Sequence, residues 1–92
     1  MIAKAKQTRT LKVGVHKVDI AMWAITKHGW EYYLEEPATD GIAFGYVMGL
    51  ENDWGSVDLA ELKPHLTCVA TGADLMDVAP PMSVHSNMEW ED

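Results

Sequence analysis

His65 and Cys68 are the side chains whose types and spacing come nearest to a reactive or metal-binding motif in this sequence. A tetrahedral zinc ion would need two more ligands, and the other histidines and carboxylates are irregularly spaced. A Cys–His nucleophile pair would need a third, orienting group and a low-pKa environment, and the sequence marks neither. We therefore expect no metal site, and we interpret Cys68 as a small buried apolar residue.

Acid–base and phosphate-binding chemistry also find little support in the sequence. Glu35 and Glu36 are adjacent, and neighbouring residues on a strand point to opposite faces, so they do not form a carboxylate pair. Gly41, Gly45 and Gly49 recur every four residues, which on a strand would leave one face open to close packing by another element. The sequence predicts a protein that is not an enzyme and that uses no cofactor.

Positive charge gathers near the N-terminal end of the chain. Residues 1–28 carry six Lys or Arg and one Asp, residues 29–92 carry one Lys and thirteen Asp or Glu, and the net charge is −7. Basic side chains could hold phosphates while aromatic side chains stack on unpaired bases. The candidate contact residues are Lys4, Lys6, Arg9, Lys12, Lys17, Trp30 and Tyr32, with Trp23 and Tyr33 as further aromatic residues nearby.

A free nucleic acid would be repelled by the overall negative charge beyond this basic patch. A protein–RNA or protein–DNA assembly fits both charge blocks, because the basic residues could touch its nucleic-acid backbone while the acidic residues meet Lys- and Arg-rich protein surfaces. The alternative interpretation is that both blocks are solvated faces of one domain and average out in space.

Length and composition predict a single domain, residues 1–92, with a small core. One cysteine excludes an internal disulfide and fits the reducing cytoplasm. Charges interrupt every apolar stretch that could serve as a secretion signal or membrane span. We expect a cytoplasmic protein with a flexible basic arm at residues 1–10 and an acidic tail at residues 82–92, which Trp90 could hold in place.

The clearest local pattern lies in the middle of the chain. Large apolar residues alternate over residues 42–48, which predicts a strand with a packed face. Glu, Asn, Asp and Gly within residues 51–55 predict a turn. Asp58 then caps a helix from Leu59 to Lys63, which Pro64 is expected to end by forbidding a helical conformation at the preceding residue.

Residues 18–34 fit two periods. As a helix, residues 15–25 would place Val and Met side chains on one face, with Gly29 as the C-terminal cap. As a hairpin, two alternating runs rich in β-branched and aromatic residues would flank a loop at Thr26–Gly29. The pattern alone leaves both alternatives open.

Shorter segments complete the predicted order. Leu11–Val15 alternates like a short strand that Gly14 weakens or bulges. Leu66–Ala70 predicts a further strand, and Asp74–Val78 predicts an extended segment before Pro80 and Pro81.

Three motifs carry a resemblance to a known family: Trp30-Glu31-Tyr32-Tyr33, then Phe44-Gly45-Tyr46-Val47-Met48-Gly49, then Gly55 to Leu62 ending in Leu59-Ala60-Glu61-Leu62. In order and spacing the chain resembles small uncharacterised proteins, known only as a domain of unknown function, that plasmids, phages and other mobile elements carry. In this chain Asp58 replaces the family's serine as helix cap. The resemblance implies a hairpin around Thr26–Gly29 and a mobile-element setting inside a bacterium. It implies no catalytic residue.

We therefore expect an α+β fold, a small antiparallel sheet of four or five strands with one short helix packed on it. The expected function is that of a non-enzymatic phage or plasmid inhibitor. It would resemble the anti-CRISPR proteins that bind a type I CRISPR-Cas surveillance complex with its guide RNA and block target DNA by occlusion. The alternatives are a plasmid or phage accessory module that binds a partner protein, and a DNA mimic.

Overall fold

The computed structural model of the chain describes residues 8–78 and 88–91. Its elements are, in chain order, β1 (Arg9–Val13), β2 (His16–Ile20), β3 (Met22–Thr26), β4 (Glu31–Leu34), β5 (Ile42–Met48), β6 (Asn52–Asp58), the helix α1 (Leu59–Leu62), the 3₁₀ helix η1 (Lys63–His65), β7 (Leu66–Thr71), the 3₁₀ helix η2 (Gly72–Asp77) and β8 (Met88–Glu91).

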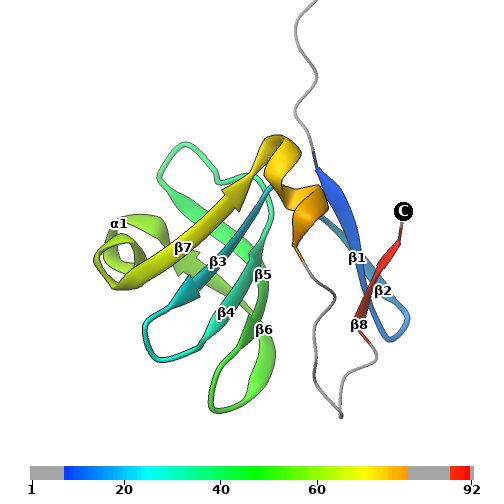
Figure 1. Cartoon of the computed structure of the whole chain (residues 1–92), viewed down its shortest axis with the longest axis horizontal. Coiled ribbons are helices and arrows are strands. Elements are labelled where there is room, and N and C mark those ends of the chain that lie inside the picture. The colour runs from blue at the N-terminus through cyan, green and yellow to red at the C-terminus, as the bar shows by residue number, and fades with distance from the viewer. Residues whose placement is uncertain (1–7, 79–87, 92) are drawn as a thin grey trace, which may run out of the picture.

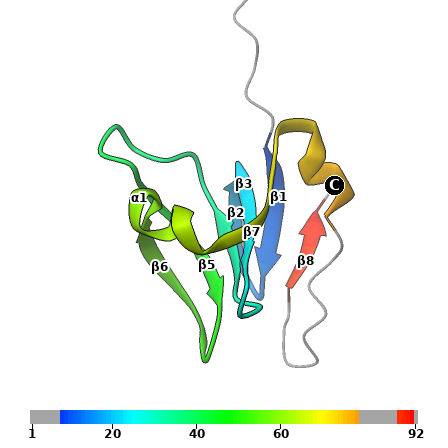
Figure 2. The ribbon, with the colours of Figure 1, turned by 60° about the vertical axis from the view of Figure 1, so that its left-hand side comes forward.

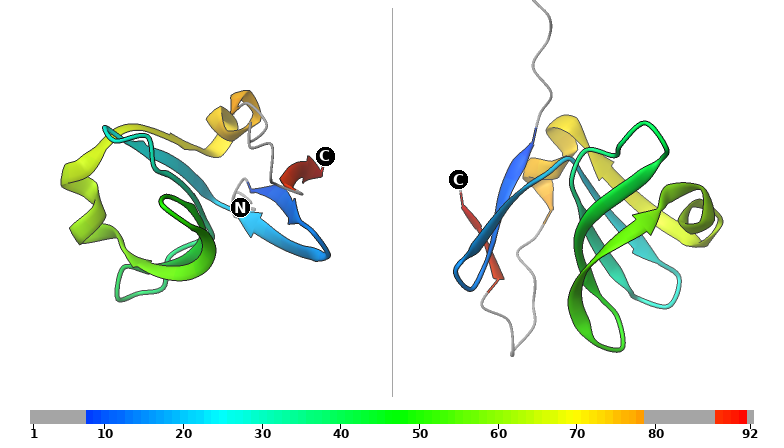
Figure 3. Two further views of the ribbon diagram at one scale, coloured as in Figure 1. Left: turned by 90° about the horizontal axis from the view of Figure 1, so that it is seen from below. Right: turned by 180° about the vertical axis from the view of Figure 1, so that it is seen from behind.

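The strands form two antiparallel sheets (Figure 1). The larger has the order β6-β5-β4-β3-β7 and curls, and α1 with η1 connects its two edge strands (Figure 3). The smaller has the order β2-β1-β8. The predicted α+β class, with a five-stranded antiparallel sheet and one short helix, is confirmed, and the three-stranded sheet is an addition to it.

The smaller sheet forms where the sequence predicts an arm and a tail. β1 begins at Arg9 and β8 covers Met88–Glu91, so both predictions are wrong at these residues. The sequence predicts a strand from Leu11 onward but none at Arg9, Thr10 or Met88–Glu91, and these residues are strands because β1 and β8 pair, with Leu11 opposite Trp90. The remaining parts of the predicted arm and tail, at residues 1–7, 82–87 and 92, lie outside the described residues, as do Pro80 and Pro81.

The ambiguous segment is a hairpin, as the resemblance implies. β3 pairs with β4 around a turn closed by a hydrogen bond from Gly29 N to Thr26 O of 2.9 Å. The first strand of this hairpin does not begin at Val18, however. Ala21 interrupts the extended segment, and the preceding β2 belongs to the other sheet. Ala21 is therefore the point at which the chain passes from one sheet to the other.

Two turns differ from the prediction, one within a predicted strand and one away from its predicted position. Gly14, with a φ of 60°, forms the turn between β1 and β2, so Val15 leaves the strand and is 89% exposed. The β5–β6 turn lies at residues 49–51, and Asn52, Asp53 and Gly55 belong to β6 instead. Pairing of Tyr46 with Trp54 extends this ladder beyond what the turn-forming residues suggest.

Helix α1 begins as predicted and ends at Leu62, and the 3₁₀ helix η1 follows it directly. The Asp58 carboxylate accepts a hydrogen bond of 2.9 Å from Ala60 N and so caps the helix. Pro64 does not exclude a helical conformation at Lys63, whose φ and ψ are −50° and −43°. Pro64 stands in the first turn of η1, where its missing N–H has no partner to lose.

Gly72–Asp77 is a 3₁₀ helix rather than the extended segment predicted for residues 74–78. Leu75 within it is fully buried.

The core has two parts, one on each face of the larger sheet. Tyr33 points to the face covered by the smaller sheet, with Leu11 and Ile20. Its neighbour Tyr32 points to the other face, with Leu62 of α1. Figures 1 and 2 accordingly show α1 and the smaller sheet on opposite sides of the larger one.

Gly45 lies where β5 closely approaches the backbone of its neighbour β4, and not another element packed on the sheet face. A Cβ atom on Gly45 would lie 2.8 Å from Leu34 Cα and would overlap the Tyr33 carbonyl oxygen. Gly49 similarly faces the Trp30 ring. Gly41 does not follow this pattern, because it lies in the turn before β5 with open space around it.

Candidate partner-binding surface

The predicted contact residue Arg9 is engaged within the protein. Its Nη1 donates hydrogen bonds to the carbonyl oxygens of Leu75 and Val78, at 2.9 and 3.0 Å. Its guanidinium also lies 4.3 Å from the centroid of the Trp90 ring. Trp90 thus adds to the pairing that holds β8 against β1, and Arg9 contributes to the junction between β1, η2 and β8.

Lys12 and Lys17 face the acidic C-terminal strand. Lys12 Nζ lies 3.9 Å from Glu89 Oε1, and Lys17 Nζ lies 2.9 Å from Glu91 Oε1. The basic and acidic ends of the sequence therefore meet across β1, β2 and β8, which is the averaging of charge in space named above as the alternative. Lys4 and Lys6 lie outside the described residues.

Trp30 and Tyr32 are placed near α1 and away from the smaller sheet. With Thr26, His28, Leu62 and His65 they line a hollow of about 180 Å³. Trp30 is 37% exposed, whereas Tyr32 is 9% exposed and packs in the core beneath α1. The structure does not bring these two aromatic residues together with Arg9, Lys12 and Lys17, which lie on the other sheet (Figure 1).

A different aromatic cluster lies on the β5–β6 hairpin. The rings of Phe44 and Trp54 are stacked, with centroids 5.8 Å apart and an interplanar angle of 4°. Tyr46 and His16 each approach the Trp54 ring edge-on, at 5.0 and 6.2 Å. We call these four residues the aromatic ledge.

The ledge borders a groove between the hairpin and β2. This groove has a volume of about 420 Å³ and is lined by His16, Lys17, Val18, Glu35, Phe44 and Trp54. Phe44 is 45% exposed, although the sequence places it on a packed face. The alternation correctly predicts that the large side chains of residues 42–48 share one face of β5. The smaller sheet covers only part of this face, which leaves Phe44 exposed.

Burial perturbs two tyrosines on this face of the sheet. Burial, and then the Glu31 carboxylate, raise the pKa of Tyr33, whose hydroxyl donates a 3.0 Å hydrogen bond to Glu31 Oε1. Trp23 Nε1 donates to the same oxygen at 3.1 Å. Burial also raises the pKa of Tyr46, with Asp53 adding to the shift. We interpret the hydrogen bonds from Tyr33 and Trp23 to Glu31 as structural, because Tyr33 is fully buried.

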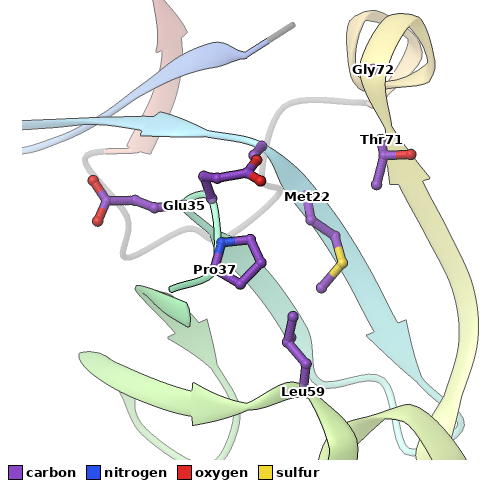
Figure 4. Close-up of a pocket in the computed structure, with 8 residues that line it drawn as sticks. Met22, Glu35, Pro37, Leu59, Thr71 and Gly72 are labelled. Atoms are coloured by element: carbon purple, nitrogen blue, oxygen red, sulfur yellow. The ribbon is translucent and has the colours of Figure 1, made fainter. Parts of the chain in front are cut away.

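A third hollow, of about 440 Å³, lies beside the point where the two sheets separate. Figure 4 shows Met22, Pro37 and Leu59 converging on it, with Thr71 and Gly72 at one side. Its walls are largely apolar, and Ala21, Glu35 and Glu36 complete them. Glu35 also lines the groove beside the aromatic ledge, so this hollow and that groove are neighbours.

Cys68 is exposed on β7, so its prediction as a buried residue is wrong. Within residues 8–78 and 88–91, no three His, Cys, Asp or Glu side chains gather closely enough to hold a metal ion. None of the helices formed by these residues has the length and apolar character needed to cross a membrane.

Comparison of the chain with models of protein families, with curated proteins and with solved structures finds no match.

Proposed function

We propose that this chain is a non-enzymatic inhibitor encoded by a phage or plasmid, which acts in the host cytoplasm on a nucleoprotein machine. The target we propose is a type I CRISPR-Cas surveillance complex, and the mechanism is occlusion of the surface that binds target DNA. The motif resemblance supports the mobile-element setting, and the aromatic ledge supports a role in binding.

One observation carries the proposal: an acidic chain presents the stacked Phe44–Trp54 pair, with Phe44 exposed and Trp54 partly buried, beside a groove. Rigid aromatic side chains are frequent hot spots of protein interfaces, because they bury much area for little loss of side-chain entropy. The net charge of −7 suits the Lys- and Arg-rich channels through which such machines bind nucleic acid.

The described basic residues add less to this proposal than the acidic ones. Arg9, Lys12 and Lys17 already contact carbonyl groups, Trp90 or glutamates of the same chain. Contact with guide RNA or DNA backbone is therefore secondary in the proposed complex, and the protein subunits provide most of the interface.

The test is co-purification of the tagged protein with a type I surveillance complex, followed by target-DNA binding. Replacing Trp54 by Ala should weaken binding by about 2 kcal/mol or more, as truncation of an aromatic hot spot does. Leu50→Ala is the control, because Leu50 is 91% exposed and lies outside the groove. Equal binding by both variants would show that the aromatic ledge is not part of the interface.

The source of the captured proteins separates the alternatives. Surveillance subunits recovered with guide RNA would support the inhibitor. Phage or plasmid proteins recovered without RNA would contradict it and favour an accessory interaction module. Release of DNA-binding proteins by competing duplex DNA, unaffected by Trp54→Ala, would favour a DNA mimic.

A further inference from the structure

The two sheets have four edge strands among the described residues: β2, β8, β6 and β7. Charged side chains on an edge oppose pairing with another strand, and three of the four edges carry them. These are Lys17 and Asp19 on β2, Glu89 and Glu91 on β8, and Asp53 and Asp58 on β6. β7, Leu66–Thr71, carries neither a charge nor a proline.

The unprotected edge is also accessible. Thr67, Cys68, Val69 and Thr71 are all exposed, and the side chain of Val69 is 46% exposed. An exposed edge with β-branched residues and no charge is a ready template for one more strand.

The direction of the free backbone groups follows from the neighbouring strand. Thr26 N donates to Trp30 O on the β4 side, whereas Lys27 N donates to His65 O on the β7 side. Backbone groups alternate along an antiparallel strand, so Ile25 and Trp23 also face β7. Their partners Cys68 and Ala70 face β3, which leaves the N–H and C=O groups of Val69 and Thr71 at the free edge.

We propose that β7 pairs with β7 of a second copy of this chain, antiparallel and about a two-fold axis at Val69. Residues opposite each other in an antiparallel pair must both face the partner, and Val69 opposite Val69 satisfies this. A two-fold axis makes such an interface self-complementary, so one edge serves both copies. This inference does not depend on the proposed function.

Charges at the two ends of β7 fit this arrangement. Lys63 and His65 precede the strand, and Asp74 and Asp77 follow it, all of them exposed. Antiparallel pairing brings the basic end of one copy to the acidic end of the other. Parallel pairing would place like charges together.

Cys68 is a direct reporter of the register. It is the only cysteine in the chain, and in the proposed dimer it lies diagonally across from its own copy, at about 7–8 Å between Cα atoms. A short bis-maleimide should therefore link two chains in dilute solution, and sedimentation should give twice the mass of one chain at higher concentration.

Val69→Lys is the decisive variant, because it places two lysines opposite each other at the axis. We expect it to lower the cross-linked fraction by about tenfold or more, since like charges directly opposite oppose strand pairing. Leu50→Lys adds the same charge at a site that is 91% exposed and lies in the β5–β6 turn, and should leave cross-linking unchanged. Circular dichroism checks that both variants fold.

Charge reversal at the strand ends provides an independent test that misfolding would not reproduce. Lys63→Glu and Asp74→Lys should each weaken the dimer by about three- to tenfold, as two symmetric surface ion pairs are lost. The double variant restores both pairs and should recover the dimer. A monomer at every concentration, cross-linking unchanged by Val69→Lys, or no recovery in the double variant would overturn the proposal.

Discussion

The Arg9 guanidinium lies over the Trp90 ring, 4.3 Å from its centroid, and so joins the first described strand to the last. The same guanidinium donates hydrogen bonds to two carbonyl oxygens, one within η2 and one just beyond its end. A residue that the sequence marks as a nucleic-acid contact is therefore a structural link between three segments distant in sequence.

Arg9→Ala should lower the free energy of unfolding by about 2 kcal/mol, because charge-assisted hydrogen bonds and a cation–π contact are lost together. Urea unfolding followed by tryptophan fluorescence measures the change. Lys12→Ala is the matched control on the same strand, and loss of its exposed 3.9 Å ion pair should cost less than about 0.5 kcal/mol. Equal losses in both variants would contradict the structural role of Arg9.

Gly45 and Gly55 face each other across β5 and β6, and they should respond differently to alanine. Gly45→Ala should cost about 3 kcal/mol or more, because the new methyl group would overlap the β4 backbone. Gly55→Ala meets no atom within 4 Å and should change stability by less than about 0.5 kcal/mol. Thermal unfolding of the two variants gives the comparison, and similar melting temperatures would refute the predicted close approach.

Tyr33 should make the protein sensitive to alkali. Its pKa is raised from 10.0 in the folded state, so the folded protein keeps a proton that the unfolded chain releases. Stability from this group is complete below pH 10 and falls above it, by up to about 1.4 kcal/mol per pH unit.

Tyr33→Phe removes this titration while it leaves Tyr46, whose raised pKa acts with the same sign. Unfolding free energies measured from pH 8 to 11 should therefore fall more steeply for the wild type than for the variant. Parallel curves would show that Tyr33 does not retain its proton.

Asp58 is the N-cap of α1, and Asp58→Ala should destabilise the protein by about 1 kcal/mol. Asp58→Ser keeps an oxygen that can accept from Ala60 N and should retain most of the stability. Denaturant midpoints distinguish the two, and a loss in Asp58→Ser as large as that in Asp58→Ala would point to a role of the negative charge instead.

Parts of the five-stranded sheet and its helix could be predicted where the residue pattern fits only one type of secondary structure. Alternation over residues 42–48 gives β5, and the capping residue Asp58 marks the start of α1. The hairpin of β3 and β4 needed the motif resemblance, because its sequence fits a helix nearly as well. These elements depend on local periods and caps, which neighbouring residues provide.

The surface features could not be predicted in the same way. Phe44 has the pattern of a core residue, and its exposure depends on how far the smaller sheet reaches across the larger one. Trp30 and Tyr32, close in sequence, differ in exposure because one lies at a turn and the other beneath α1.

Composition and local pattern alone thus establish an acidic α+β domain with β5, β7 and α1 close to their observed positions. They leave open the partners of β1 and β8, because pairing between the two ends of a chain depends on contacts that no local window contains. Those contacts bring Lys17 to Glu91 and Arg9 to Trp90. Basic residues of β1 and β2 and acidic residues of β8 therefore lie in one sheet. Arg9, Lys12 and Lys17 contribute to the structure for that reason, whereas Phe44 of the aromatic ledge and Val69 of the β7 edge are exposed.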